Sequence, residues 1–140
     1  MDKTELVKQA IDARNNSYSP YSKYRVGAAL LCSDGSIVTG ANIENASYGA
    51  TVCAERTAVF KAVSEGKKGF DAIAIAGGPS EEKGELSGYA TPCGMCRQVL
   101  REFTDPDEFI VIVARSVNDF KEYTLAALLP ESFGPEKLEK

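Results

Sequence analysis

Residues 91–100 read TPCGMCRQVL, and their two cysteines, Cys93 and Cys96, stand between a proline and the start of a helix-like apolar pattern. A Cys-x-x-Cys pair in this setting fits three kinds of site. It can be a redox couple, because a helix N-terminus stabilises a thiolate; it can be half of a structural zinc ribbon; or it can supply two ligands of a catalytic metal. The rest of the chain has to distinguish between them.

The periodicity on both sides of this pair predicts an α/β fold. In chain order the expected elements are a helix over 3–15, two strands within 26–44 joined by a turn at 33–36, a helix over 54–65 ended by Gly66, a strand over 70–78, a helix over 97–103 and a strand over 109–114. Asp2 and Glu5 form a capping box for the first helix. Val99, Leu100 and Phe103 are expected to face the core. This order predicts a mixed sheet between helices.

The composition is that of one globular domain over residues 1–140, with 44% hydrophobic and 26% charged residues. A net charge of −4 gives no positive field for phosphate backbones, so we expect no nucleic-acid partner. The chain has no apolar run of about 18 residues to span a bilayer, and its N-terminal stretch lacks a signal-peptide pattern. We therefore expect a cytoplasmic protein without a membrane partner.

Four cysteines and no histidine narrow the interpretation of the pair. A zinc ribbon takes two close pairs of Cys or His ligands, and this chain has one such pair. A redox couple needs no third partner, so that alternative stays open. A three-thiolate metal site needs one more cysteine, and Cys53 is the better candidate because it precedes its helix much as Cys93 does. Cys32 lies in a strand and is expected to be a buried apolar residue.

A three-thiolate site would suit catalysis, because three protein ligands leave one position of tetrahedral zinc open for water. Zinc lowers the pKa of such a water from about 16 to about 7, and a neighbouring carboxylate can then carry protons. Glu55 stands two residues after Cys53, so both can face one metal only if Cys53 lies at the irregular entrance of the helix. Taken alone, Glu55 and Arg56 could equally be a solvated charge pair.

Two motifs together resemble the zinc signature of the cytidine deaminase family: CAER at 53–56 and PCGMCRQ at 92–98. PYSKYRVGAAL at 20–30, GANIENASYG at 40–49 and LLPESFGP at 128–135 are similar to that family's other blocks, so the resemblance covers nearly the whole chain. It is strongest to the small homotetrameric branch with three cysteine ligands.

This resemblance implies a three-layer α/β/α sandwich with a five-stranded mixed sheet and one Zn²⁺ per subunit. It implies hydrolysis of cytidine, and of 2′-deoxycytidine, to the uracil nucleoside and ammonia in pyrimidine salvage. Cys53, Cys93 and Cys96 would hold the zinc. Glu55 would be the catalytic proton carrier, and Arg56 would withdraw electron density from the thiolates.

The resemblance also implies a set of substrate-binding residues, namely Asn42, Glu44, Tyr24, Ala54, Tyr48 and Phe133. Asn42 and Glu44, as alternate residues of a strand, would bind the ribose hydroxyls from one face. Tyr24 stands where much of the family has phenylalanine beside the nucleoside. Tyr48 and Phe133 match positions that reach a neighbouring subunit's site, so they depend on a homotetramer.

Other interpretations share parts of this pattern. A deaminase acting on cytosine in a nucleotide, RNA or DNA would use the same metal centre, but a strand-binding enzyme should carry a basic or aromatic channel. A non-enzymatic, zinc-stabilised interaction domain would not need Glu55. From the residues alone, Asn42 could equally be a turn residue. Residues 79–90 match no block of the family, and the sequence assigns them no function.

Overall fold

The computed structural model describes residues 1–138 and is built on a five-stranded sheet in the order β2-β1-β3-β4-β5. The strands are β1 (Tyr24–Cys32), β2 (Ile37–Ala41), β3 (Phe70–Pro79), β4 (Ile110–Ser116) and β5 (Asp119–Thr124). β1 pairs antiparallel with β2 and β3, and β4 does so with β5, whereas β3 and β4 are parallel. The sheet is therefore mixed, as predicted.

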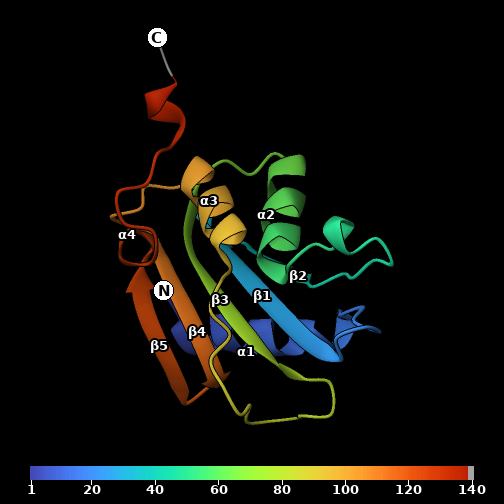
Figure 1. Ribbon diagram of the computed structural model, residues 1–140. Coiled ribbons are helices and arrows are strands. Elements are labelled where there is room, and N and C mark those ends of the chain that lie inside the picture. The colour runs from blue at the N-terminus through green and yellow to red at the C-terminus, as the bar shows by residue number, and fades with distance from the viewer. Residues whose placement is uncertain (139–140) are drawn as a thin grey trace.

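Helices cover both faces of the sheet (Figure 1). The helices are α1 (Lys3–Ala13) on one face, α2 (Ala54–Ser64) and α3 (Gly94–Phe103) on the other, and the short α4 (Leu125–Leu128) after β5. Parallel strands need a crossover connection, and α3 provides it between β3 and β4. This arrangement confirms the three-layer α/β/α sandwich that the sequence predicts.

Each face of the sheet has its own apolar core, and β3 contributes to both. Its alternate residues Ala72, Ala74 and Ala76 pack with α1, whereas Ile73 and Ile75 pack with α2 and α3. This division follows from the two-residue period of a strand. Complete burial of an isoleucine side chain stabilises the fold by roughly 1.5–3 kcal/mol, so the α2/α3 face receives the larger apolar contribution from β3.

Helix α2 lies close to the sheet because position 40 is a glycine. A Cβ on Gly40 would come within 2.5 Å of the Ala58 backbone nitrogen and 2.7 Å of the Ala54 carbonyl oxygen. Any side chain there would push α2 outward, together with Cys53 at its start. At the other end, Gly66 has φ +89° and follows the helix, as predicted.

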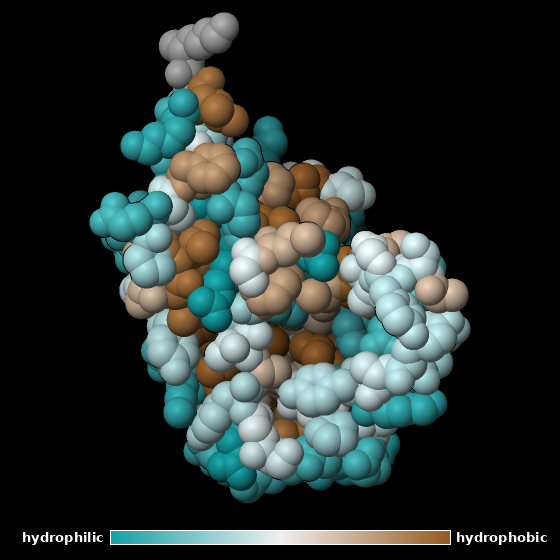
Figure 2. Space-filling model, viewed as in Figure 1, coloured by the Kyte–Doolittle hydropathy of each residue, from teal (hydrophilic) through white to brown (hydrophobic). Residues whose placement is uncertain are grey.

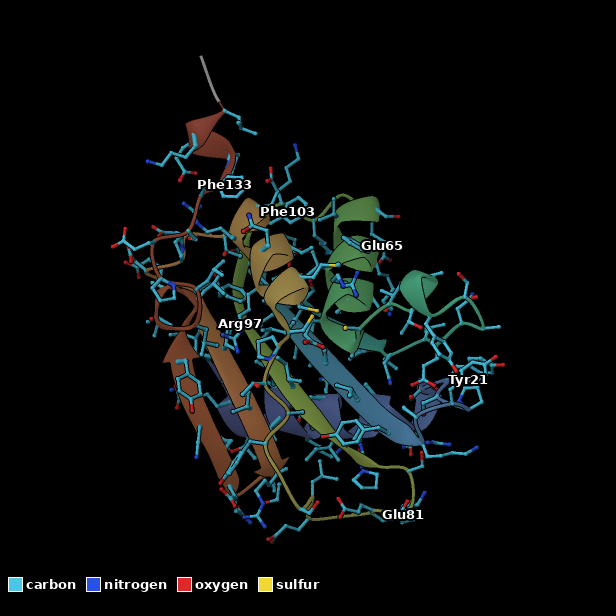
Figure 3. All side chains as sticks on the ribbon, in the orientation of Figure 1. Tyr21, Glu65, Glu81, Arg97, Phe103 and Phe133 are labelled. Atoms are coloured by element: carbon cyan, nitrogen blue, oxygen red, sulfur yellow. The ribbon has the colours of Figure 1, made fainter. Side chains whose placement is uncertain are left out.

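The structure differs from the sequence-based prediction at the helix ends. The first helix ends at Ala13 and continues as a 3₁₀ turn to Asn16, and α3 begins at Gly94. Leu100 is buried as predicted, but Phe103 is 37% exposed. The prediction for Phe103 was wrong because α3 ends there, which leaves its side chain beyond the core at the outer end of the helix (Figure 3). Within residues 1–138, no helix combines the length and apolar character needed to cross a membrane.

Candidate metal centre and active site

The three cysteines predicted as metal ligands meet between the starts of α2 and α3, where sulfur atoms cluster in Figure 3. Cys53 is the N-cap of α2, Cys93 is the N-cap of α3, and Cys96 lies in the first turn of α3. Their Sγ atoms lie within 4.8 Å of one another, with 3.4 Å between Cys93 and Cys96 and 3.9 Å between Cys53 and Cys93. Zn–S bonds of about 2.3 Å in a tetrahedron place sulfurs about 3.8 Å apart, so the three thiols fit zinc.

The helix starts also favour the thiolate form that a metal requires. The backbone N–H of Cys96 donates to Cys93 Sγ at 3.4 Å, and both helix N-termini direct positive dipole ends at the cluster. A hydrogen bond from Cys96, aided by Arg56, lowers the pKa of Cys53 to about 5. The same bond to Cys53, together with burial, raises the pKa of Cys96. Metal binding should therefore displace a proton from Cys96.

Arg56 lies one turn after Cys53 on α2 and contacts the cluster directly. Its Nη2 donates to Cys53 Sγ at 3.5 Å, and this bond raises the pKa of the guanidinium. Three thiolates around Zn²⁺ would carry a net charge of −1, so a permanent cation beside them lowers the electrostatic repulsion. Arg56 therefore contacts the thiol cluster and is not simply a solvated helix charge.

Glu55 is also withdrawn from solvent, with only 4% of its surface exposed. Burial is the main reason that its pKa is raised to about 7. A carboxyl group with this pKa can hold or release a proton near neutral pH. Because Cys53 is in extended conformation at the helix entrance, its side chain and that of Glu55 both line one pocket.

This pocket beside the thiols has a volume of about 270 Å³. It is lined by Tyr24, Val26, Asn42, Thr51, Cys53, Ala54, Glu55, Ile75, Ala90, Thr91 and Cys93. Four of the residues implied by the resemblance to bind substrate or carry protons, Tyr24, Asn42, Ala54 and Glu55, thus share one cavity with two of the cysteines. Its mixture of apolar walls and few polar groups is typical of a small-molecule site.

The prediction that Asn42 and Glu44 are alternate residues of a strand was wrong, because β2 ends at Ala41 and both lie in the segment beyond it. Most of the Asn42 carboxamide already has partners. Its Oδ1 accepts from the backbone N–H of Val26 at 2.9 Å and from the Ser17 hydroxyl, while Nδ2 donates to the Tyr24 carbonyl oxygen at 2.9 Å. Asn42 therefore holds the pocket entrance in shape. Nδ2 carries a second hydrogen besides the one bonded to Tyr24, and Asn42 lines the pocket.

Glu44 lines a neighbouring pocket of about 380 Å³ with Tyr21, Ser22, Tyr48 and Thr51. Its carboxylate accepts from the backbone N–H groups of Tyr21 at 3.0 Å and Ser22 at 3.1 Å, and from the Ser22 hydroxyl. The bond from the Ser22 hydroxyl is the main reason that the pKa of Glu44 is lowered. Thr51 lines both pockets, so the two lie side by side.

Phe133 does not join either pocket within this chain. Its side chain is 59% exposed, and its carbonyl oxygen accepts from Gln98 Nε2 at 3.0 Å beside α3. Tyr48 reaches the second pocket but is 75% exposed. Cys32 is buried in the core with 2% exposure, as predicted.

Sequence reasoning missed Thr51, Ser22, Ala90 and Thr91 as pocket residues. Thr51 and Thr91 each stand two residues before a ligand cysteine, and this repeated Thr-x-Cys spacing was an available signal. Arg97 was missed as well. Its guanidinium donates to the Pro92 carbonyl oxygen at 2.7 Å and to that of Leu128 at 2.6 Å, which fixes the approach to Cys93.

Comparisons with known proteins agree with this geometry. A cytidine deaminase from Halalkalibacterium halodurans is 47% identical over 138 residues, which cover 99% of this chain and 98% of that protein. The crystal structure of a cytidine deaminase from Burkholderia pseudomallei matches with a TM-score of 0.81 at 41% identity, covering 92% of this chain and 97% of that one. The crystal structure of a cytidine deaminase from Mycobacterium tuberculosis matches with a TM-score of 0.79 at 37% identity, covering 96% of this chain and 98% of that one.

The family described as the cytidine and deoxycytidylate deaminase zinc-binding region matches residues 1–113. That match includes all three clustered cysteines, both helix starts that carry them, and Glu55. The thiol geometry accounts for the zinc-binding part of the description, since the three sulfurs are spaced as zinc requires. On sequence and on structure alike, this chain belongs to the cytidine and deoxycytidylate deaminase family.

Proposed function

We propose that this protein is a zinc-dependent cytidine deaminase that converts cytidine and 2′-deoxycytidine to the uracil nucleoside and ammonia. One observation carries the proposal: two of the three clustered thiols, Cys53 and Cys93, line the same pocket as a buried carboxyl group with a pKa of about 7. Burying a carboxyl group costs desolvation free energy, and a zinc-stabilised interaction domain would have no use for a carboxyl group buried beside its metal.

Zinc held by Cys53, Cys93 and Cys96 would supply a Lewis acid that makes water nucleophilic near neutral pH. Exchange of the C4 amino group for oxygen also requires protons to reach ring N3 and the departing nitrogen. Glu55 can accept a proton on its carboxylate and pass it to these atoms, because its pKa lies near neutrality. Proton transfer by a positioned side chain typically contributes about 10²- to 10⁴-fold in rate.

Arg56 and the two helix N-termini would keep the metal centre effective. Thiolates donate strongly to zinc, and each donation weakens the metal as a Lewis acid. The hydrogen bond from Arg56 to Cys53 Sγ withdraws electron density from that sulfur, and the N–H of Cys96 does so at Cys93 Sγ. We assign Arg56 this supporting role.

The two neighbouring pockets suit the two parts of a nucleoside. The pocket beside the thiols would take the pyrimidine, with Tyr24 at its side and Ala54 in its wall. The second pocket would take the sugar, where Glu44 is an ionised acceptor, and Asn42 would offer its remaining Nδ2 hydrogen from the wall of the pocket beside the thiols. Ribose hydroxyls can donate to a carboxylate and accept from an amide, so this pair matches their chemistry.

We further propose that the protein acts as a homotetramer in which Tyr48 and Phe133 complete a neighbouring subunit's site. The support is exposed apolar surface, which usually marks an interaction site. Figure 2 shows apolar residues gathered over α2 and α3, where Phe60 is 47% and Met95 61% exposed. Four free cysteines fit a reducing compartment, so we place the enzyme and its role in pyrimidine salvage in the cytoplasm.

The ultraviolet absorbance of cytosine tests the proposed activity. Zinc-loaded protein should convert cytidine and 2′-deoxycytidine, and should act much more slowly on cytidine 5′-monophosphate. No absorbance change with either nucleoside, in protein shown to hold zinc, would contradict the assignment. Size-exclusion chromatography with light scattering tests the tetramer, and a fully active monomer would overturn the shared site.

A further inference from the structure

The connector between β3 and α3, residues 80–92, includes most of the segment to which the sequence assigns no function, and it forms part of the pocket wall. We propose that the connector holds Ala90 against Gly77 and thereby limits the size of substituent accepted at C5 of the pyrimidine ring. In this proposal Ala90 determines specificity and Tyr89 is a positioning residue. The proposal rests on the proposed cytidine deaminase activity and adds a specificity determinant to it.

The connector wraps around the end of the sheet. Leu86 is completely buried in the core on the α1 face, whereas Tyr89 and Ala90 pack against the core on the α2/α3 face. In Figure 1 the connector passes below the sheet, in yellow, and returns along the α2/α3 face to reach α3. A segment inserted into both cores has little freedom to drift away from the pocket.

The middle of the connector is also clamped to the β4–β5 edge. Leu86 donates its backbone N–H to the Arg115 carbonyl oxygen at 2.9 Å, and Arg115 Nε returns a bond to the Leu86 carbonyl oxygen at 2.8 Å. Arg115 forms ion pairs with Glu85 at 3.0 Å and Asp119 at 2.9 Å. These bonds fix the backbone a few residues before the pocket wall.

Tyr89 extends the clamp to the residue next to Ala90. Its hydroxyl donates to Asp119 Oδ1 at 2.5 Å. Lys121 Nζ lies 4.4 Å from the centroid of its ring and the Arg115 guanidinium 5.7 Å, both within the range of cation–π attraction. Tyr89 is thus tied to β4 and β5 through its ring and its hydroxyl, and Ala90 follows it by one residue.

Ala90 itself rests on the backbone of β3. A Cβ on Gly77 would lie 2.8 Å from the Ala90 Cβ, 3.1 Å from Tyr24 Cε1 and 3.1 Å from Val26 Cγ2. All three of these neighbours line the pocket. The glycine lets them converge on the sheet, and this close contact leaves Ala90 no room to retreat before a larger ligand.

The chemistry of the wall selects which edge of the ring meets it. The side chains of Val26, Ile75 and Ala90 contain only carbon and hydrogen, whereas those of Asn42 and Glu55 carry polar atoms, and all five residues line the pocket. Cytosine carries its polar atoms on O2, N3 and N4, while C5 and C6 bear only hydrogen. A polar edge against carbon would lose its hydrogen bonds, so the C5–C6 edge belongs on the apolar wall. A substituent at C5 therefore meets the surface that Ala90 forms.

The test compares kcat/KM for cytidine and 5-methylcytidine across four variants of the zinc-loaded protein. Ala90→Gly removes one methyl group from an apolar pocket and should shift the preference towards 5-methylcytidine about tenfold. Ala90→Val adds two carbons and should shift the preference the other way. Tyr89→Phe removes the bond to Asp119 and should relax the preference severalfold through KM, with zinc content unchanged. Tyr123→Phe on β5 is the matched control and should match wild type.

Each outcome decides the proposal. If both Ala90 variants change the two substrates by the same factor, Ala90 does not determine specificity. If Tyr89→Phe leaves KM and the substrate preference unchanged while the Ala90 variants shift it, Tyr89 is not a positioning residue. A wild-type protein that holds zinc but turns over neither nucleoside overturns the proposed function, and this inference with it.

Discussion

Glu55 and Glu44 line two neighbouring pockets and carry the same carboxyl group in opposite surroundings. Burial raises the pKa of Glu55 to about 7, whereas hydrogen bonds led by the Ser22 hydroxyl lower the pKa of Glu44. Glu55 can therefore exchange a proton near neutral pH, while Glu44 stays an ionised acceptor. The surroundings, and not the residue type, separate acid–base work from recognition.

The two pockets are also supported differently. The metal end stands on the first turns of α2 and α3, where the backbone fixes the sulfurs. The sugar end stands on loops, where Glu44 itself holds the Tyr21–Ser22 backbone in place. Substitutions at the metal end should therefore change the zinc content and kcat, and substitutions at the sugar end should change KM.

The largest effect is expected when a ligand cysteine is removed. The Cys96→Ala variant should lose zinc and show no detectable turnover, because it retains only two of the three thiolate ligands that hold the metal. Cys32→Ala is the matched control, since Cys32 is equally buried but lies in the core. Metal analysis and the cytosine absorbance assay measure both. Zinc retained in Cys96→Ala at the wild-type level would contradict the ligand set.

The buried carboxyl group should make the zinc-free protein sensitive to pH. Folded Glu55 keeps its proton up to a pKa of about 7, whereas the unfolded chain releases it near 4.5, so stability falls as pH rises through that window. The fall is at most about 3 kcal/mol. The zinc-free Glu55→Gln variant should not show this loss of stability with rising pH. It should therefore be more stable than zinc-free wild type at pH 8 but not at pH 4.5. Urea unfolding with a chelator measures this, and parallel pH profiles would contradict it.

Arg56→Ala should lower kcat/KM about 10- to 100-fold, the usual range for a group that tunes metal ligands. Without its bond to Cys53 Sγ the thiolate becomes more electron-rich, and the zinc it holds becomes a weaker Lewis acid. The pH–rate profile should shift to higher pH. Lys61→Ala, an exposed cation on the same helix, should leave rate and profile unchanged. An unaltered profile in Arg56→Ala would count against this role.

The smallest effect is expected at the sugar end. Glu44→Gln keeps the shape of the side chain but replaces a charged acceptor by a neutral one, so KM for cytidine should rise about tenfold. Turnover at saturation should stay near wild type, because Glu44 lines the second pocket, to which none of the clustered cysteines contributes. Glu65→Gln, at the end of α2, is the control. A loss confined to kcat would remove the distinction between the two pockets.

The same contrast explains how much the sequence could predict. The sheet, its helices and the cysteine cluster follow from contiguous patterns, since periodicity and helix starts are local. The sequence did not identify Ser22, Thr51 and Ala90 as pocket residues, because contacts between segments that are distant in the sequence determine their positions. Phe103 was assigned to the core from helical spacing, which does not reveal where the helix leaves the sheet. Residues 79–90 gave no signal, because their fixed position depends on partners such as Arg115 and Asp119 on other strands.

The most direct measurement is cytidine turnover by Glu55→Gln, with zinc content determined on the same sample. A buried carboxyl group that carries protons beside an intact metal centre predicts zinc at the wild-type level and turnover reduced about 10²- to 10⁴-fold. Glu65→Gln, prepared in parallel, should turn over cytidine like wild type. Wild-type turnover in Glu55→Gln would contradict the account, because the pocket would then deaminate cytidine without the proton carrier on which the mechanism depends.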